Sequence, residues 1–467
     1  MKYYLGIDLG TTGTKTILFD ENGTPLGKGY KSYELLSSAD GFFEERAEDW
    51  YSAVVDTVKL ATENFSGEIS AMSFSAQGGS FLFCDVKDGT PVPLTNAITW
   101  MDRRATKEAE ALGDAYFNLT QKKMDSSNML AKYLWVKNNM KDAFEKAKYV
   151  LSTSDYIYMK VTGDAIIDHT SAAMMGVYDT ELNGYDERLT SLVGLSTDKF
   201  PRIVKGGDFI GYANDEFLRD TGLSGRICVY AGLHDQFAAS LGANYFSASD
   251  LIISTGTTWV VFARSREMLN GSFACRRHPA GDFGYFISAV SSGVVLEWEK
   301  SLFGLPYKEM DELAKERPID ENLLVYPFVS GNGEYRGQNV LNFSIKNASY
   351  KHEKGDIFKA TLEGVAFEIK EILNIYETNG FKINNVIVTG GATRSDVWMQ
   401  ILSDTLGKRL YLSEQADGCC FGAFSVAKCG ERGEFFKFQF SGRTVEPNHE
   451  NHQKYLEKFK KYNKNLI

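Results

Sequence analysis

The first twenty residues contain two apolar runs separated by a short polar segment. Residues 3–9 and 16–19 are mostly apolar, and the segment between them carries glycines, hydroxyls and a lysine. This pattern predicts two strands joined by a tight hairpin. Gly10 and Gly13 are expected to take positive φ at the tip, which would bring the backbone close to a ligand.

The tip of this hairpin has the chemistry of an anion site. The hydroxyls of Thr11 and Thr12, together with backbone N–H groups, can donate to phosphate oxygens. Asp8 stands at the end of the first strand, where a carboxylate can hold Mg²⁺ directly or through its waters. An ordinary surface hairpin with polar tip residues is the alternative. A Walker loop is excluded, because the pattern G-x-x-x-x-G-K-[ST] does not occur here.

A second copy of the hairpin pattern occurs far downstream. Residues 251–254 and 259–263 are mostly apolar, and Thr255-Gly256-Thr257-Thr258 lies between them. The pattern again predicts strand, Gly-Thr-Thr turn and strand. Two such hairpins indicate two related halves, each offering a phosphate-binding turn to one nucleotide.

Two further strands lead into polar segments. Residues 69–74 predict a buried strand that ends in Gln77-Gly78-Gly79, and small ligands bind at such strand ends in open α/β sheets. Residues 227–231 predict a strand that feeds a short helix starting near Asp235. Oriented N–H groups at a helix N-terminus favour an ionised carboxylate, which suits a proton acceptor. The alternative is that Asp235 only caps the helix.

The downstream half contains the clearest helix of the chain. Apolar residues recur at helical spacing over residues 356–379 and predict core scaffolding. A strand over 385–389, a bare glycine turn and an amphipathic helix over 395–406 follow. Glycine at such a turn would let an adenine ring lie flat on the backbone, although a strand-glycine-helix junction is common. Residues 435–467 predict a peripheral helix.

Composition limits the class of protein. A chain of 467 residues with 43% hydrophobic and 24% charged residues is expected to form two globular domains, which we place at residues 1–243 and 244–467. A net charge of −10 argues against nucleic acid or an anionic membrane as the main partner. The six cysteines show no C-x-x-C spacing, and neither a secretory signal nor an apolar run of ~18 residues is present. We therefore expect a cytoplasmic protein.

The chain resembles the FGGY family of carbohydrate kinases, and the match runs along nearly its whole length. The resemblance rests on four segments in the right order: Asp8-Leu9-Gly10-Thr11-Thr12 with Lys15, Gly232-Leu233-His234-Asp235-Gln236, Ser254-Thr255-Gly256-Thr257, and Gly390-Gly391-Ala392-Thr393-Arg394-Ser395-Asp396-Val397-Trp398. It implies a two-domain α/β protein with the actin-like, ribonuclease-H-like ATPase fold and a cleft between the lobes.

The resemblance also implies roles for individual residues. Asp235 is the expected catalytic base, and Asp8 is expected to support Mg²⁺. The expected ATP contacts are Gly10, Thr11, Thr12, Lys15, Thr257, Gly293, Gly391 and Ser395. The expected substrate contacts are Gln77, Gly78, Gly79, Asp102, Arg103 and Gln236. For Asp102 and Arg103 the alternative is a helix N-terminus in which Asp102 caps and the arginines are solvated.

Two positions depart from the pattern of the family. Gly78 and Gly79 stand where xylulose-kinase-like members commonly have Met-His, which contact the sugar. Two glycines at these positions are expected to leave more room for the sugar and to offer it only backbone donors. His234 stands where relatives often have Gly or Ala, so it could touch substrate or only fill space.

The expected reaction is transfer of the γ-phosphoryl group of ATP to a hydroxyl of a ketose, with a pentulose such as D-xylulose as first choice. Ribulose, erythritol or glycerol are alternative acceptors. An actin-like regulatory or binding protein that uses ATP without sugar transfer is the alternative from another class. The expected partners are therefore a small sugar or polyol and ATP, and the formation of a homodimer is left as a possibility.

Overall fold

The computed structural model describes residues 1–38, 41–243, 250–269, 275–337, 341–413, 417–438 and 442–466. The chain packs as two compact units. The first unit comprises Met1–Asn244, Arg276–Gly281 and Asp417–Phe438, and the second comprises Tyr245–Cys275, Asp282–Ala416 and Gln439–Ile467. The domain division at residue 243 stays a prediction, and its boundary segment, residues 244–249, lies outside the described residues.

The first unit is built on a seven-stranded sheet of order β15-β16-β6-β1-β2-β3, in which β17 also pairs with β6. Strands β1, β2 and β3 form an antiparallel meander, whereas β6 runs parallel to β1, β16 and β17. The strands are β1 (Tyr3–Gly10), β2 (Gly13–Asp20), β3 (Pro25–Ser32), β6 (Ile69–Ala76), β15 (Phe209–Tyr212), β16 (Cys228–Tyr230) and β17 (Leu233–His234). The first predicted hairpin is therefore confirmed.

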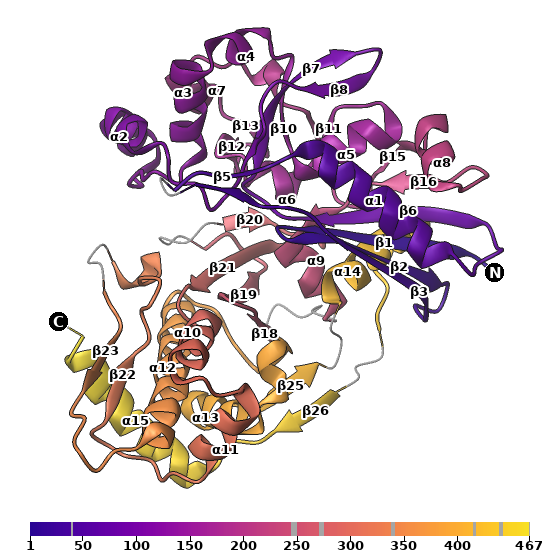
Figure 1. Ribbon diagram of the computed structural model, residues 1–467. Coiled ribbons are helices and arrows are strands. Elements are labelled where there is room, and N and C mark those ends of the chain that lie inside the picture. Colours follow the sequence, from indigo (N-terminus) through magenta and orange to yellow (C-terminus); the bar gives the residue numbers. More distant parts are fainter. Residues whose placement is uncertain are drawn as a thin grey trace. The chain divides into compact units, whose positions relative to one another are not determined.

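Helices cover both faces of this sheet (Figure 1). Alternate residues of β1 point to opposite faces: Leu5 and Ile7 join a core with Trp50 of α1, whereas Tyr4 packs with Phe424 of α14. The helices of this part are α1 (Ala47–Thr62), α5 (Thr153–Thr162), α8 (Asp215–Thr221), α9 (Asp235–Gly242) and α14 (Gly418–Arg432). Helix α14 comes from the far end of the sequence, and no local pattern indicated that it would pack on β1.

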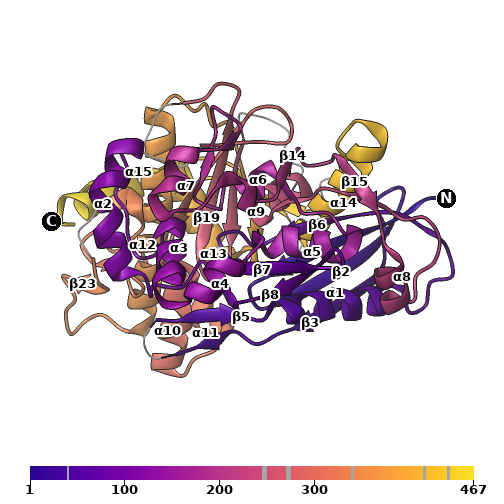
Figure 2. The ribbon, with the colours of Figure 1, turned by 90° about the horizontal axis from the view of Figure 1, so that it is seen from above.

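A smaller sheet of order β10-β7-β9-β5-β4, with β8 paired to β7, completes the first unit. Figure 2 shows α3, α4 and α7 beside it, around a core that includes Phe81 and Tyr133. Its elements are β4 (Leu36–Ser37), β5 (Phe43–Glu45), β7 (Phe81–Lys87), β8 (Thr90–Pro93), β9 (Ala97–Ile98), β10 (Tyr149–Ser152), α2 (Thr106–Thr120), α3 (Met129–Asn139), α4 (Lys141–Lys146) and α7 (Glu187–Val193).

Short elements connect these layers. They are β11 (Ile166–Asp168), α6 (His169–Ala172), β12 (Tyr178–Asp179), β13 (Gly184–Tyr185), η1 (Thr197–Lys199) and β14 (Arg202–Val204). The short strand β20 (Cys275–Arg277) is instead the edge strand of the sheet that contains β21 (Phe283–Ala289). Strand β11 is parallel to β14, and β12 is antiparallel to β13. Asp168 accepts hydrogen bonds from the backbone N–H groups of Thr170 and Ser171 and thereby caps α6.

The sheet of the second unit repeats the pairing scheme of the first. Strands β18, β19 and β21 form an antiparallel meander, β18 is parallel to β24, and β24 is parallel to β25, with β26 at one edge. The strands are β18 (Asp250–Thr255), β19 (Trp259–Ser265), β21 (Phe283–Ala289), β24 (Asn385–Gly390), β25 (Leu410–Ser413) and β26 (Gly442–Val445). The second predicted hairpin is confirmed, and the shared scheme agrees with two related halves.

The long predicted helix forms the centre of the second unit. It is α12, and its stripe of Phe358, Leu362, Val365 and Ile369 lies in the main core. Helix α12 spans Lys354–Thr378. The other elements of this unit are α10 (Gly293–Phe303), α11 (Tyr307–Lys315), β22 (Leu324–Tyr326), η2 (Glu334–Arg336), β23 (Ser344–Lys346), η3 (Gly391–Arg394), α13 (Asp396–Leu406) and α15 (His449–Lys464). None of the described helices is both long and apolar enough to cross a bilayer.

The C-terminal helix is better packed than its charged sequence suggests. Tyr455 and Tyr462 of α15 are buried in the main core, and the ring of Tyr462 stacks on Tyr326 at 4.5 Å between centroids. Lys458 of the same helix is buried and pairs with the buried Glu363 of α12. The prediction of a helix in this region is confirmed, but its apolar stripe makes it part of the core rather than peripheral.

We expect the contact of α9 with α14 to tolerate no extra methyl group. A Cβ at Gly422 would lie 1.9 Å from the carbonyl oxygen of Ala238, which is closer than atoms can approach. Gly422→Ala should therefore lower the free energy of unfolding by about 1–3 kcal/mol, the usual cost of overpacking. Thermal and urea unfolding would measure the change.

Gly113→Ala is the matched control, because Gly113 lies inside α2 and a Cβ there would meet nothing within 4 Å. Alanine should raise the free energy of unfolding there by up to about 1 kcal/mol through helix propensity. Equal effects of the two substitutions would contradict the packing argument.

Candidate active site

Strand β6 brings two carboxylates to one edge of the first unit's large sheet. Its Ser75 pairs with Asp8 of β1 on one side and with Leu233 of β17 on the other. Asp235 follows two residues later as the first residue of α9. Because the three strands are parallel, their carboxyl ends meet at the edge where ligands bind in open α/β sheets. The N-cap residue of α9 is His234, so Asp235 is not itself the cap.

Burial disfavours the charged form of both carboxylates. It raises the pKa of Asp8 to about 6; a hydrogen bond from Ser75 opposes this change and the charge of Asp235 adds to it. Burial likewise raises the pKa of Asp235 to about 6, against hydrogen bonds from Gln236. The Asp235 side chain nevertheless keeps 31% of its surface exposed. At neutral pH two ionised carboxylates share this site, which favours a cation or a proton donor between them.

The hairpin tip lies next to these groups and is held by side chains from other elements. Thr11 Oγ1 donates to Oε1 of Gln77 at 3.0 Å and accepts from Nε1 of Trp100 at 3.2 Å, whereas Thr12 is exposed. Lys15 is paired with Asp417, with 2.7 Å between Nζ and Oδ1. The predicted phosphate contacts Thr11 and Lys15 therefore have partners within the first unit already.

The prediction that Gly10 and Gly13 take positive φ is wrong, since neither is among the described glycines with such a backbone. Gly13 is required for a different reason. A Cβ there would lie 2.5 Å from the carbonyl oxygen of Lys31 on the neighbouring strand β3. Close pairing of β2 with β3, rather than turn geometry, accounts for this glycine.

A buried glutamate that the sequence analysis did not select supports the hairpin tip. Glu45 Oε2 accepts from Nε1 of Trp50 at 2.8 Å and from Nε2 of Gln77 at 2.7 Å. Burial raises the pKa of Glu45 to about 7, and these two hydrogen bonds oppose the change. Because Glu45 holds the amide nitrogen of Gln77, the amide oxygen is turned toward Thr11. The acid preceding a tryptophan was visible in the sequence, but its partner Gln77 was not.

The Gly78-Gly79 segment does not leave the room that we expected. A Cβ at Gly78 would lie 2.3 Å from Cδ2 of His234, and one at Gly79 would lie 3.0 Å from Cβ of Trp100. Gly79 has positive φ, at 73°, and Gly78 does not. The expectation of an open floor is therefore corrected: His234 and Trp100 occupy the space beside the two glycines.

Asp102 and Arg103 lie in the loop before α2. Asp102 is fully buried, and its oxygens accept from the backbone N–H of Phe43 at 2.7 Å and from the guanidinium of Arg104. Arg103 is exposed and donates to the carbonyl oxygens of Trp100 and Asp102. The alternative of a capping Asp102 with solvated arginines does not describe this loop, because Ala105 is the N-cap of α2 and the side chain of Arg104 is buried.

The second unit brings Thr257 and Gly293 together. Thr257 is exposed at the tip of the β18–β19 hairpin, and its carbonyl oxygen accepts from the backbone N–H of Val294 at 2.9 Å. A Cβ at Gly293 would lie 2.1 Å from the carbonyl oxygen of Gly256. Helix α10 can therefore start against the hairpin tip only because residue 293 is glycine.

Gly391 and Ser395 follow β24 on the same sheet. A Cβ at Gly391 would meet nothing within 4 Å, so the backbone is open on that side. The turn is tied to the hairpin, since the backbone N–H of Ala392 donates to Oγ1 of Thr255 at 3.1 Å. Ser395 caps α13 by accepting from the N–H of Trp398, and its hydroxyl donates to Asp311 at 2.9 Å.

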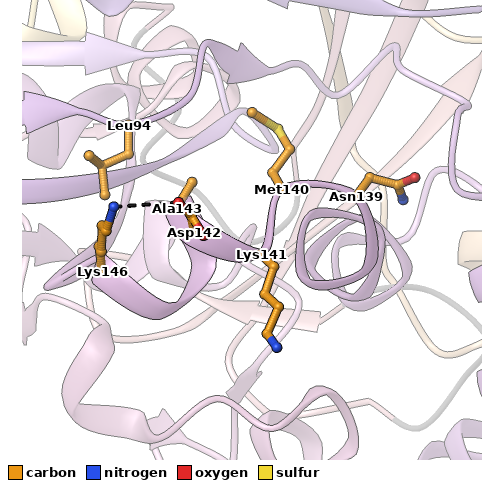
Figure 3. Close-up of a pocket in the computed structure, with 7 residues that line it drawn as sticks. All are labelled: Leu94, Asn139, Met140, Lys141, Asp142, Ala143 and Lys146. Atoms are coloured by element: carbon orange, nitrogen blue, oxygen red, sulfur yellow. Dashed lines mark hydrogen bonds and ion pairs between the residues drawn. The ribbon is translucent and has the colours of Figure 1, made fainter.

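The largest-scale features outside these segments do not include a predicted site residue or a metal cluster within the described part of the chain. A surface hollow of about 520 Å³ around α4 is lined by Leu94 and residues 139–143 and 146, and contains none of the predicted site residues (Figure 3). Within the described part of the chain, no group of three or more His, Cys, Asp or Glu side chains is arranged to hold a metal ion. Mg²⁺ commonly binds through one or two carboxylates plus substrate phosphates, so this finding does not oppose Asp8 as its support.

Comparison with known proteins assigns the chain to a class. The model of the N-terminal domain of the FGGY family of carbohydrate kinases matches residues 3–242, and the model of the C-terminal domain of the same family matches residues 251–429. With two units of this fold, the protein is a carbohydrate kinase, a phosphotransferase that acts on a sugar hydroxyl. More narrowly, the chain belongs to the FGGY family.

Individual relatives agree with this assignment. The chain is 27% identical to a xylulose kinase of Bacillus subtilis (strain 168) over 92% of this chain and 88% of that protein. It is 26% identical to a gluconokinase of the same organism, over 90% and 86%. The solved structure of a ligand-bound xylulose kinase from Lactobacillus acidophilus has a TM-score of 0.92 at 22% identity and covers 99% of this chain and 97% of that one. The predicted family and fold class are confirmed.

The raised pKa of Asp235 has a consequence for stability. The pKa rises from its ordinary 3.8 to about 6 on folding, so the folded state holds its proton more tightly than the unfolded chain does. This contribution is fully present below the unfolded pKa and is lost as the pH rises through about 6. At neutral pH the charge of Asp235 therefore destabilises the free protein.

We expect Asp235→Asn to raise the free energy of unfolding at pH 7 by about 1–3 kcal/mol, allowing for partial exposure of the side chain. The gain should disappear below about pH 4, where Asp235 is protonated in both states. Urea unfolding at several pH values would measure it, with the exposed Asp114→Asn as the control. An equal gain at pH 4 and pH 7 would contradict the electrostatic origin.

Proposed function

We propose that this carbohydrate kinase transfers the γ-phosphoryl group of ATP to a hydroxyl of a ketose, with a pentulose such as D-xylulose as the acceptor. The observation that carries the proposal is the register of β6, which sets Asp8 and Asp235 on either side of one strand end, next to the Thr11–Thr12 tip. An acceptor for a proton, a support for a cation and donors for phosphate therefore lie in one place.

Asp235 is the proposed general base. Its carboxylate is partly exposed at the first turn of α9, and its pKa of about 6 leaves it ionised but basic at neutral pH. Such a group can accept the proton of the attacking sugar hydroxyl as the new P–O bond forms. Phosphoryl transfer has a loose transition state, so alignment of that hydroxyl contributes more than proton removal alone.

Asp8 and the two hairpin tips are proposed to bind Mg²⁺ and the phosphate groups. Mg²⁺ would be held by Asp8, and when bound it neutralises the charge on the β- and γ-phosphates. Thr11, Thr12 and Lys15 are proposed to donate to phosphate oxygens. Because Lys15 is paired with Asp417, that ion pair would have to open before Lys15 binds phosphate. In the second unit, the exposed Thr257 is proposed to bind phosphate.

The glycine turn of the second unit is the proposed adenosine site. The open side of Gly391 leaves room for a flat ring against the backbone. Gly293 sets the start of α10 against the Thr257 tip, so its proposed role is to shape the nucleotide site. Ser395 fixes the orientation of α13 through its cap, and its proposed contact with the nucleotide uses a hydroxyl that also binds Asp311.

The acceptor is inferred from the relatives and from the strand-end residues. Several curated relatives are named xylulose kinase, including those of Bacillus subtilis and Lactococcus lactis. Gln77, Gly78, Gly79, Arg103 and Gln236 are the proposed sugar contacts in the first unit. Because Asp102 is buried and fully engaged, its proposed contribution is to hold the loop that presents Arg103. The five cysteines whose side chains are described are free thiols, which supports a cytoplasmic reaction.

Asp235→Ala tests the assignment of the base. We expect the rate of sugar phosphorylation to fall by roughly 10²–10⁴-fold, the usual contribution of a positioned base. Binding of ATP, measured by calorimetry, should change by less than about threefold because the phosphate donors remain. A variant that keeps a near-normal rate in an ADP-release assay would show that another group accepts the proton.

A panel of acceptors tests the substrate class. We expect ADP release to be stimulated most strongly by D-xylulose, compared with ribulose, erythritol, glycerol and gluconate at equal concentration. Measurement of kcat/KM for each acceptor gives the ranking. Preference for gluconate would overturn the ketose assignment, and ATP turnover that no acceptor changes would favour a regulatory ATPase.

A further inference from the structure

A chain of hydrogen bonds runs from a buried carboxylate to the tip of the first hairpin. Oε2 of Glu45 accepts from Nε2 of Gln77 at 2.7 Å, and Oε1 of Gln77 accepts from Oγ1 of Thr11 at 3.0 Å. Oγ1 of Thr11 in turn accepts from Nε1 of Trp100 at 3.2 Å. Glu45 is fully buried and Gln77 is 3% exposed, whereas Trp100 is 44% exposed. The chain therefore leads from the interior of the first unit to its surface.

The chemistry of its two ends gives this chain a single direction. The indole of Trp100 is a donor only, and the Glu45 oxygen that accepts from Gln77 also accepts from the indole of Trp50 at 2.8 Å. Gln77 must therefore turn its NH₂ group toward Glu45 and its oxygen toward Thr11. The Thr11 hydroxyl donates its proton to Gln77 and uses one lone pair for Trp100, so only one lone pair is left.

This direction does not depend on the charge of Glu45. Burial raises the pKa of the carboxyl to about 7, so it is partly protonated in neutral solution. Among the described residues, Oε1 of Glu45 has no hydrogen-bond partner. A proton would therefore occupy Oε1, because Oε2 already accepts two hydrogen bonds, and Oε2 stays an acceptor in both states.

Backbone pairing fixes the members of the chain relative to one another. Glu45 lies opposite Ala97 in the pair of β5 with β9, shortly before Trp100. The backbone N–H of Gln77 donates to the carbonyl oxygen of Leu9 at 2.8 Å, just before the hairpin tip. The two larger sheets of the first unit thus hold the carboxylate, the amide and the indole in place.

We propose that the Thr11 hydroxyl accepts a hydrogen bond from a hydroxyl of the sugar, and that Glu45 and Gln77 are positioning residues that fix this polarity. The remaining lone pair can bind a sugar hydroxyl, which donates, but not a phosphate oxygen or a ketone oxygen, which only accept. Contact of Thr11 with phosphate is then limited to its backbone N–H. The inference rests on the proposed transfer to a sugar hydroxyl.

The surroundings of Thr11 agree with this assignment. Both of its partners belong to segments that carry proposed sugar contacts: Gln77 directly precedes Gly78, and a Cβ at Gly79 would lie 3.0 Å from Cβ of Trp100. The neighbouring hydroxyl of Thr12 is exposed and is not part of the chain. Thr12 therefore keeps a proton that it can donate to phosphate.

Paired substitutions at Thr11 test which substrate its hydroxyl binds. Thr11→Val removes the hydroxyl and keeps the shape of the side chain, whereas Thr11→Ser keeps the hydroxyl. We expect Thr11→Val to raise KM for the sugar by roughly three- to tenfold, as for loss of one hydrogen bond. KM for ATP should change by less than about twofold, because backbone N–H donors remain. A raised KM for ATP with an unchanged KM for the sugar would overturn the inference.

Analogues of the preferred sugar test the polarity. Singly deoxy sugars lack one hydroxyl, and the matching deoxyfluoro sugars replace it with fluorine, which cannot donate. At the position bound by Thr11, both analogues should lower kcat/KM of the wild type by the same factor, and neither should lower it in Thr11→Val. If fluorine restores kcat/KM wherever the deoxy sugar loses it, or if Thr11→Val loses as much as the wild type at every position, the inference is wrong.

Glu45→Met tests the positioning role. It removes the acceptor that orients Gln77, so KM for the sugar should rise about as much as in Thr11→Val. Glu45→Gln is the matched control, because its amide oxygen can replace Oε2 as the acceptor, and it should recover most of the loss. In the Thr11→Val background, Glu45→Met should add little. Full additivity would contradict action through Thr11, and the sugar analogues still decide the polarity if Glu45→Met does not fold.

The outcomes distinguish this inference from the proposed function. If the analogues show no need for a donor at any position while Asp235→Ala is inactive, the assignment of Thr11 is wrong and transfer to a sugar hydroxyl stands. If no acceptor stimulates ADP release, the proposed function fails and this inference fails with it. Preference for gluconate would overturn the ketose alone, because deoxy and deoxyfluoro gluconates allow the same comparison.

Discussion

The parallel pairing of β6 with β1 and β17 is the constraint on which the proposed catalytic residues depend. Neighbouring strands are held about 4.8 Å apart by their hydrogen bonds, so Ser75 fixes the spacing between the ends of β1 and β17. Asp8 and Asp235 belong to segments far apart in the sequence; Asp8 lies in this ladder and Asp235 directly follows its last paired residue, so the pairing brings their backbones together. The same strand end leads into Gln77, which binds the Thr11 hydroxyl.

Close approach of backbones makes this arrangement rigid. A Cβ at Gly6 would lie 2.2 Å from the carbonyl oxygen of Cys420, and one at Gly232 would lie 1.7 Å from that of Phe74. Glycines at these positions let α14 and the segment before β17 pack against the central strands. The proposed base is thus carried by a segment with little freedom to shift, which favours a fixed angle of attack.

Three buried carboxylates of the first unit add to the acidity of a chain whose net charge is already −10. Asp8, Asp235 and Glu45 all have pKa values raised to about 6 or 7 by burial. Such carboxylates oppose folding at neutral pH, and shifted pKa values of this kind cluster at functional sites.

The short-range pattern of apolar and polar residues was enough to predict many helices and strands of this protein. The alternation of apolar residues around Gly10–Gly13 and Thr255–Thr258, and the helical stripe of α12, identify elements whose residues are neighbours in the chain. Position at a strand-to-helix junction made Asp235 a candidate, and the resemblance to the FGGY family was needed to assign it the role of base. Only the tertiary structure showed that Gly78 faces His234, that Glu45 holds Gln77, that Asp102 is buried, and that α14 packs on β1. Each of these is a contact between distant segments, and burial and steric exclusion depend on what folds against a residue rather than on its sequence neighbours.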